Sequence, residues 1–228
     1  ARRGRIPTMA HEHGHEHKHT HTDFDQAAAT WDDQPDRLDR SRRIADAIAE
    51  AVPLASVRDA MEYGCGTGQV TWALADRLDR VLLADASPGM LAVVAQRIAD
   101  RPDADRHRFE ARALDLTTES LPSASLDLIY SSMALHHVPD VPLALRRMRD
   151  ALRPGGHIAI ADLDHDPLGH FHGADFDGHH GFDRDALAAQ LVEAGFTTPA
   201  ITTAATITKH LDGAPREFGL FLAVASVG

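Results

Sequence analysis

The segment EYGCGTG contains a carboxylate followed by three glycines at alternate positions, which are Gly64, Gly66 and Gly68. Glycine lets the backbone turn sharply and lets a ligand approach closely, so this run suits the binding of a small molecule. A dinucleotide fingerprint would place its third glycine where Gln69 stands, and this speaks against a nicotinamide oxidoreductase. Glu62 precedes the glycines; it is poorly placed to face a pyrophosphate but suits a ligand with an ammonium group.

A second carboxylate, Asp85, ends the next apolar run, RVLLAD. Open α/β sheets bind ligands at the carboxyl ends of their strands, where both the glycine turn and Asp85 are expected. A carboxylate in that place can accept hydrogen bonds from both hydroxyls of a ribose. Glu62, the glycines and Asp85 in register therefore predict a ligand site at this edge of the sheet.

Histidines are the candidates for general acid–base chemistry. His136 and His137 lie in ALHHVPD, directly after a predicted strand, and we expect them on the same side of the sheet as the glycine turn. The segment DLDHDPLGHFHGADFDGHHGF adds five more, which are His165, His170, His172, His179 and His180. The candidate bases or pocket residues are His136, His137, His179 and His180.

The histidine-rich segment has three open interpretations. It forms a substrate pocket or lid, it binds a metal through the histidines between 165 and 180, or it is a solvated loop. Its histidine spacing matches no strong zinc signature, and glycine-rich flanks preorganise ligands poorly. About 19 residues is long for a structureless connection in a compact domain, which favours a functional segment.

A second histidine-rich stretch, HEHGHEHKHTH, lies near the N-terminus. It has no apolar residues to bury, so we expect residues 1–22 to be a disordered tail that binds metal weakly. The residues before Met9 look like a vector remnant or upstream read-through. No signal peptide is expected, because the N-terminus lacks an apolar core region.

Composition narrows the class of protein. The 228 residues suffice for one domain, which we expect at residues 23–228. The net charge of −11 argues against a nucleic-acid partner. No apolar run approaches the roughly 20 residues that a membrane span needs. The single cysteine, Cys65, cannot form an internal disulfide and points to a reducing cytoplasm.

Hydrophobic periods predict an α/β chain in which strands and helices alternate. Strands are expected at RDAMEYG, RVLLAD, HRFEARAL, SLDLIYSS and GHIAIADL, with helices between them. Ser87, Asp140 and Asp183 are predicted helix caps. Two final β-rich runs joined by LDGAP predict a hairpin. The sequence therefore predicts a doubly wound, mostly parallel sheet with an antiparallel C-terminal hairpin.

These motifs resemble those of the class I S-adenosylmethionine-dependent methyltransferases, especially the ubiquinone/menaquinone C-methyltransferase-like group. The resemblance runs from about Phe24 to the C-terminus and rests on EYGCGTG, ADASPGML, ALDL, SLDLIYSSMALHHVPD and LRPGGHIAIADL in order. It implies a seven-stranded Rossmann-like methyltransferase fold with S-adenosylmethionine as cofactor. Tyr63 departs from the family, which usually has a small or aliphatic residue there.

The resemblance also implies roles for residues of the site. Around the methionyl part it places the three glycines, Glu62 and Ser131. Asp85 would bind the ribose hydroxyls. The adenine would contact Ala86, Met90, Asp115 and Leu116.

The expected activity is methyl transfer to a small-molecule acceptor by in-line displacement, with oxygen or carbon ahead of nitrogen. Such a displacement chiefly needs alignment and exclusion of water, and a base only where the acceptor must lose a proton. The alternative is a metal-binding or metal-dependent protein that uses its histidine-rich segments on the same fold. A divalent metal is the less favoured second cofactor.

Overall fold

The computed structural model describes residues 21–173 and 175–228, with side chains from residue 24 onward. Most of the predicted N-terminal tail lies outside these residues. The first helix begins at His21, slightly before the expected start of the domain. In the described part of the chain the helices are α1 (His21–Ala27), α2 (Pro35–Ala51), α3 (Gln69–Leu74), α4 (Pro88–Ala99), α5 (Asp103–Arg106), α6 (Val141–Ala151) and α7 (Arg184–Glu193). Short 3-10 helices are η1 (Ala28–Asp33), η2 (Leu54–Ser56), η3 (Ala75–Arg77) and η4 (Leu135–His137).

Across the described residues, one seven-stranded sheet has the order β3-β2-β1-β4-β5-β7-β6. Its strands are β1 (Asp59–Tyr63), β2 (Arg80–Asp85), β3 (Phe109–Ala113), β4 (Leu126–Ser132), β5 (Leu152–Leu163), β6 (Ala200–Leu211) and β7 (Ala214–Ser226). The first five strands pair in parallel, whereas β7 is antiparallel to both β5 and β6. The predicted doubly wound sheet and its C-terminal hairpin are confirmed. The reversed strand is β7, which lies between β5 and the edge strand β6.

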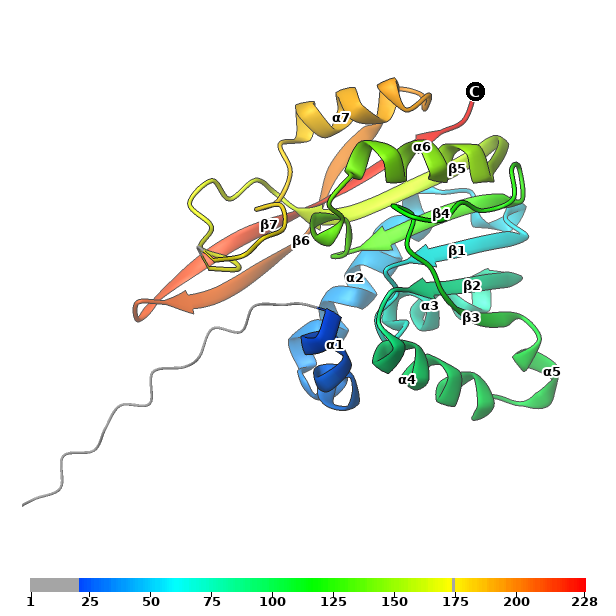
Figure 1. Ribbon diagram of the computed structural model, residues 1–228, viewed down its shortest axis with the longest axis horizontal. Coiled ribbons are helices and arrows are strands. Elements are labelled where there is room, and N and C mark those ends of the chain that lie inside the picture. Colours follow the sequence, from blue (N-terminus) through cyan, green and yellow to red (C-terminus); the bar gives the residue numbers. More distant parts are fainter. Residues whose placement is uncertain (1–20, 174) are drawn as a thin grey trace, which may run out of the picture.

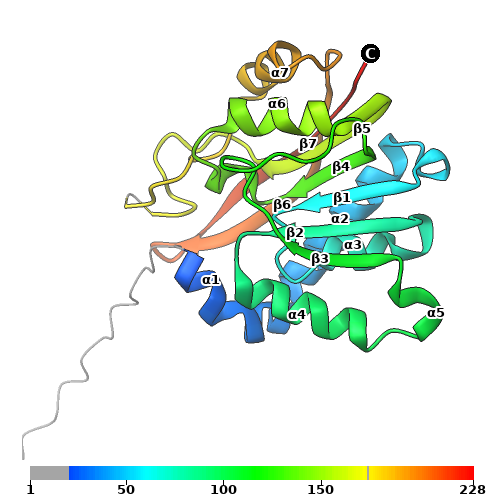
Figure 2. The ribbon, with the colours of Figure 1, turned by 45° about the vertical axis from the view of Figure 1, so that its right-hand side comes forward.

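Helices cover both faces of the sheet (Figures 1 and 2). On one face α6 and α7 bury Leu145, Leu187 and Leu191 against the strands. On the other, α2 and α4 bury Ile44, Ile48 and Val94 in a second cluster. Burial on both faces is why the central strands read as nearly continuous apolar runs. In the described part of the chain, no helix is long and apolar enough to cross a membrane.

The predicted helix caps are confirmed. The Ser87 hydroxyl accepts a hydrogen bond from the Met90 N–H at 3.2 Å. The Asp140 and Asp183 carboxylates likewise accept from N–H groups in the first turns of α6 and α7, each at 2.9 Å. These side chains satisfy donors that a helix leaves unpaired at its start.

Two elements differ from their predicted extents. The helix expected between RDAMEYG and RVLLAD ends at Leu74 and continues as a 3-10 turn. Strand β5 begins at Leu152 instead of Gly156. The early start is possible because the pairing of β5 with β4 shifts between Leu126 and Leu128, which accommodates Pro154 and Gly155.

Candidate functional site

A cavity of about 250 Å³ lies where β1, β2 and β4 end. These strand ends are adjacent because Glu62 is in register with Leu83 of β2 and Tyr130 of β4. The N-terminal segment contributes Phe24, Trp31, Asp32, Arg37, Arg40 and Ser41 to the lining. From the sheet side the lining includes Glu62, Tyr63, Gly64, Cys65, Gly66, Thr67, Asp85, Ala86, Met90, Asp115, Thr117, Ser132, Met133, Ala134 and His137.

The glycine turn forms the floor of this cavity. A Cβ added at Gly64 would lie 2.2 Å from the Ala134 Cβ, so a side chain there would collide with the neighbouring turn. A Cβ at Gly66 would meet nothing within 4 Å, so this position is open toward the cavity. Gly68 lies outside the lining and packs tightly against Trp72 and Leu83. The first two glycines therefore serve the site directly, whereas Gly68 packs α3 against the sheet.

Glu62 is buried at the base of the turn. Its carboxylate accepts hydrogen bonds from the N–H of Thr71 at 3.1 Å and from the Thr71 hydroxyl, whose oxygen lies 2.6 Å from the Tyr130 hydroxyl. Burial raises the pKa of Glu62 to about 8, which outweighs the opposing effect of Thr71. A cationic ligand in the cavity would favour the ionised form.

Asp85 is held by backbone donors on both sides. Its Oδ2 accepts from the Gly66 N–H at 2.7 Å, and its Oδ1 accepts from the Ser87 N–H at 2.8 Å. These bonds fix the carboxylate in the cavity wall beside the glycine turn. An oriented carboxylate of this kind can accept hydrogen bonds from ligand hydroxyls.

The next part of the wall combines apolar surface with a further carboxylate. Met90 and Ala86 line it as predicted, and Asp115 Oδ1 accepts from both the N–H and the hydroxyl of Thr117 at 2.7 Å. Leu116 is fully buried and lies outside the lining. Tyr63 also lines the cavity, and burial raises its pKa to about 12.

Ser131 was predicted to face the ligand, but Ser132 is the serine that lines the cavity. Ser131 is buried, and its hydroxyl has no hydrogen-bond partner among the described residues. Successive side chains of a strand point to opposite faces, so a shift of one position decides which serine reaches the site.

The N-terminal segment is fastened over the cavity at two points. Asp25 accepts from the Ser87 hydroxyl at 2.5 Å and from the Gly89 N–H at 2.8 Å, which ties α1 to the start of α4. Asp32 accepts from the Thr67 hydroxyl at 2.8 Å and pairs with Arg97. Both attachments hold a cover over the cavity that can exclude water.

The cover contributes Trp31 to the lining together with Phe24, Arg37 and Arg40, three residues that the sequence did not single out. The rings of Phe24 and Trp31 meet edge to face, with their centroids 5.6 Å apart. The signal for the arginines was the spacing of Arg40, Ile44 and Ile48 by four along one helix face, which places a cation at the end of an apolar stripe.

Of the four candidate bases, only His137 lines the cavity. Its ring lies 5.1 Å from that of Phe24 in the N-terminal segment. His136 is buried instead, and its Nδ1 lies 2.6 Å from the Oδ1 of Asp162. The pair is therefore part of the core beneath the site.

The histidine-rich segment, which the structure describes at residues 162–173 and 175–182, packs behind this pair through ring contacts. The His172 ring stacks on Phe176 at 4.1 Å and lies 4.8 Å from the ring of His136. His179 lies outside the cavity lining; its N–H donates to the His136 carbonyl at 2.8 Å, and its Nε2 lies 3.0 Å from the Val138 carbonyl. The segment is thus an ordered support for the turn that carries His137.

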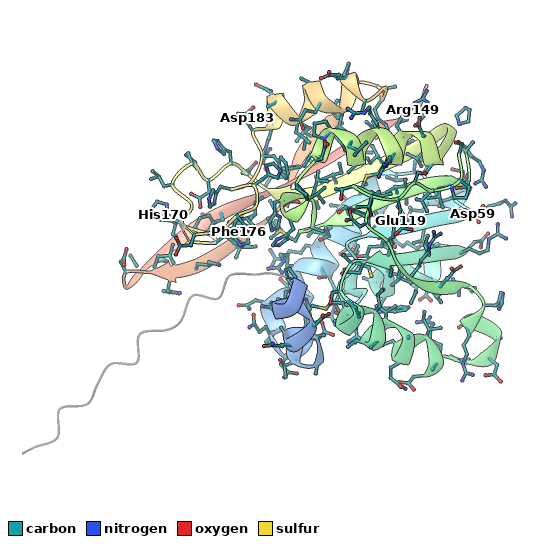
Figure 3. The ribbon with its side chains drawn as sticks, in the orientation of Figure 1. Asp59, Glu119, Arg149, His170, Phe176 and Asp183 are labelled. Atoms are coloured by element: carbon teal, nitrogen blue, oxygen red, sulfur yellow. The ribbon has the colours of Figure 1, made fainter. Side chains whose placement is uncertain are left out.

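The remaining histidines of this segment, His165, His170 and His180, do not line the cavity. His165 is exposed, and the His170 Nδ1 lies 3.5 Å from the Asp166 carboxylate. Figure 3 shows His170 and Phe176 on the segment, which runs beside the β6–β7 hairpin. His180 packs beneath Gly169 and also lies outside the cavity lining.

Metal binding by this segment remains a prediction. In residues 21–173 and 175–228, no group of three or more His, Cys, Asp or Glu side chains is arranged to hold a metal ion. The candidate ligands His165, His170, His172, His179 and His180 instead make the backbone, ring and ion-pair contacts described above.

Residues 61–158 match the methyltransferase domain family. The chain is 38% identical over 146 residues to malonyl-(acyl-carrier protein) O-methyltransferase of Dechloromonas aromatica, covering 61% of this chain and 48% of that protein. It is 33% identical over 147 residues to trans-aconitate 2-methyltransferase of Deinococcus radiodurans, covering 62% and 53%. The chain therefore spans about half the length of these curated relatives.

The fold is also similar to phosphoethanolamine N-methyltransferase 2 of Haemonchus contortus, solved in complex with S-adenosyl-L-methionine. The TM-score is 0.64 at 17% identity, covering 80% of this chain and 52% of that one. The family match over residues 61–158 includes the glycine turn and the strand-end carboxylates, and the sheet has the predicted topology. On this combined ground, the chain is similar to the S-adenosylmethionine-dependent methyltransferases, with the family match extending over residues 61–158.

Proposed function

We propose that this protein transfers a methyl group from S-adenosylmethionine to a small-molecule acceptor. The observation that carries the proposal is the single cavity wall in which the Gly66 N–H is bonded to Asp85, with Glu62 beneath and Met90 beside it. In this wall, Asp85 offers a carboxylate to ligand hydroxyls and Glu62 offers a carboxylate to an ammonium group. Met90 offers an apolar surface to the adenine ring. The residues present therefore fit the donor.

Each part of the chain has a binding or orienting task. Asp85 accepts hydrogen bonds from the ribose hydroxyls, and Glu62 faces the amino group of the methionyl part. Asp115 and Met90 contact the adenine. When bound, S-adenosylmethionine supplies a methyl group on a sulfonium, which is an excellent leaving group. The cover that contains Phe24 and Trp31 excludes water and holds the acceptor in line, which is the main requirement of such a displacement.

His137 is the residue best placed to take a proton from the acceptor. It lines the cavity, whereas His136, His179 and His180 do not. A base is needed for an oxygen or an activated carbon acceptor. The name of the relative malonyl-(acyl-carrier protein) O-methyltransferase supports oxygen as the acceptor atom.

We also infer that residues 23–228 form one methyltransferase domain and that the protein acts in the cytoplasm. One continuous sheet supports the first inference. The second is supported by the single cysteine, buried Cys65. One cysteine cannot form an internal disulfide, and proteins without disulfides are typical of a reducing compartment.

Calorimetric titration with S-adenosylhomocysteine tests the proposal directly. The full chain is expected to bind it with a stoichiometry of one and to show no heat with NAD⁺ under the same conditions. Binding of NAD⁺ in place of S-adenosylhomocysteine, or of neither, would overturn the proposal. A methyl-acceptor screen with labelled donor then follows on the same preparation.

A further inference from the structure

Two arginines of α2, Arg37 and Arg40, line the same cavity as the strand-end carboxylates. Both are half-buried. In the described part of the chain, no hydrogen bond or ion pair engages the Arg40 guanidinium, and its charged neighbours are Arg37 and Asp36. Burial and the charge of Arg37 lower the pKa of Arg40, the direction expected of a cation that is short of counterions.

Arg37 is held in place without being neutralised. Its Nη1 donates to the Trp31 carbonyl at 3.1 Å, and its Cζ lies 3.9 Å from the centre of the Trp31 ring. Asp32, whose charge acts on Arg37, forms its ion pair with Arg97 and accepts a hydrogen bond from Thr67. Stacking on Trp31 orients the guanidinium and leaves other N–H donors for a ligand.

The other cavity carboxylates are occupied by partners of their own. Glu62 accepts from Thr71, Asp85 accepts from backbone N–H groups, and Asp115 accepts from Thr117. A partly buried cation without an ion-pair partner is costly, so these arginines indicate a ligand that supplies negative charge. The chain as a whole carries a net charge of −11, so an anion needs such a local positive site to bind at all.

We propose that the methyl acceptor carries an oxyanion, a carboxylate or a phosphate, that is bound by the arginine pair Arg37 and Arg40. The inference rests on the proposed methyl-transfer function. The donor has only one carboxylate, whereas the cavity has two guanidiniums, so the pair can serve both the donor and the acceptor. Guanidinium groups bind planar oxyanions through two parallel hydrogen bonds, which fixes orientation as well as charge.

The test uses the full chain saturated with S-adenosylhomocysteine and a panel of probes. The probes are benzoate, malonate, trans-aconitate and phenyl phosphate, with benzamide as the uncharged counterpart of benzoate. The variants are Arg37→Gln and Arg40→Gln, and the matched control is Arg42→Gln, an exposed position of the same helix that does not line the cavity. Binding is followed by calorimetry, and S-adenosylhomocysteine affinity is measured separately for every variant.

The wild type is expected to bind at least one anionic probe and not benzamide. At least one cavity variant should weaken that binding about 10- to 100-fold, the scale of losing charged hydrogen bonds, with S-adenosylhomocysteine affinity within about threefold. The Arg42→Gln control should match the wild type. Should either variant unfold, Arg→Lys at the same position keeps the charge, loses the planar fork and is expected to weaken the probe partially.

The carboxylate and phosphate arms distinguish the two kinds of oxyanion. The inference is overturned if no anionic probe binds to protein that binds S-adenosylhomocysteine. It is equally overturned if both variants weaken only S-adenosylhomocysteine, since the pair then serves the donor alone. Failure of the proposed function has a different signature, because S-adenosylhomocysteine itself would not bind.

Discussion

The Oδ2 atom of Asp85 accepts a hydrogen bond from the Gly66 N–H at 2.7 Å, and this bond joins the end of β2 to the turn after β1. The Oδ1 atom accepts from the Ser87 N–H at the start of α4. One carboxylate thereby fixes the position of two loops that border the cavity. Its orientation is set by the backbone before any ligand arrives, which is a form of preorganisation.

Asp85→Asn should therefore weaken S-adenosylhomocysteine binding about 10- to 100-fold, because charge-assisted hydrogen bonds to the ribose are lost. The amide keeps the size of the side chain but replaces one of the two oxygens that accept from the Gly66 and Ser87 N–H groups, so folding of the variant is checked by a thermal melt. Calorimetry on the variant and on the exposed control Asp79→Asn checks this. An Asp85→Asn protein that is folded and has wild-type affinity would remove Asp85 from the site.

Glu62 predicts a pH dependence of stability. Burial raises the pKa of Glu62 to about 8 in the folded protein, whereas an unperturbed glutamate side chain has a pKa of 4.5. Between these values the native state binds more protons than the unfolded chain, so stability falls as the pH rises. The contribution of one such group has a slope of at most about 1.4 kcal/mol per pH unit.

Urea unfolding at pH 5, 6, 7 and 8 measures this slope. Glu62→Gln removes the titrating group. As the pH rises, the free energy of unfolding of the wild type should therefore fall relative to that of this variant. Glu110→Gln, at an exposed position of β3, is the matched control and should follow the wild type. Parallel curves for the wild type and Glu62→Gln would contradict the raised pKa.

Two adjacent histidines should behave differently when each is replaced. His136→Ala leaves the buried Asp162 carboxylate without its ring partner, which should cost about 1–3 kcal/mol of unfolding free energy. His137→Ala, at the cavity wall, should cost less than about 1 kcal/mol but reduce methyl transfer to an acceptor that must lose a proton. Unfolding curves and the rate on an acceptor found by screening separate the two roles. Equal destabilisation would argue against the assignment of His136 to the core.

Most of the sheet could be predicted because both of its faces are buried, so each central strand is an apolar run with clear ends. The caps at Ser87, Asp140 and Asp183 were equally readable, since a short polar side chain before an apolar period has a defined task. The start of β5 was not readable, because Pro154 and Gly155 normally end an element. Only the shifted pairing with β4 admits them.

The site was predictable where a backbone turn defines it and not where a loop folds back on it. Glu62, Gly64, Gly66, Asp85, Ala86, Met90 and Asp115 were all predicted and all line the cavity. The choice between Ser131 and Ser132 depends on strand phase at the last residues of β4. That Arg37 and Arg40 reach the cavity depends on how the N-terminal segment is tied to Ser87 and Thr67, which is a tertiary contact.

Metal content separates the remaining interpretations of the histidine-rich segments. Protein lacking residues 1–20, purified without a nickel column, should contain far less than one metal ion per chain by elemental mass spectrometry. The reason is that His136, His172, His179 and Phe176 pack against one another through rings and backbone bonds instead of converging on one point. The full chain, prepared in parallel, is the control. It should contain more metal than the shortened chain, because it keeps the histidine-rich stretch near the N-terminus. About one metal ion in the shortened chain would instead indicate a metal centre among the histidines between 165 and 180, and replacement of His170 and His172 would then have to abolish it.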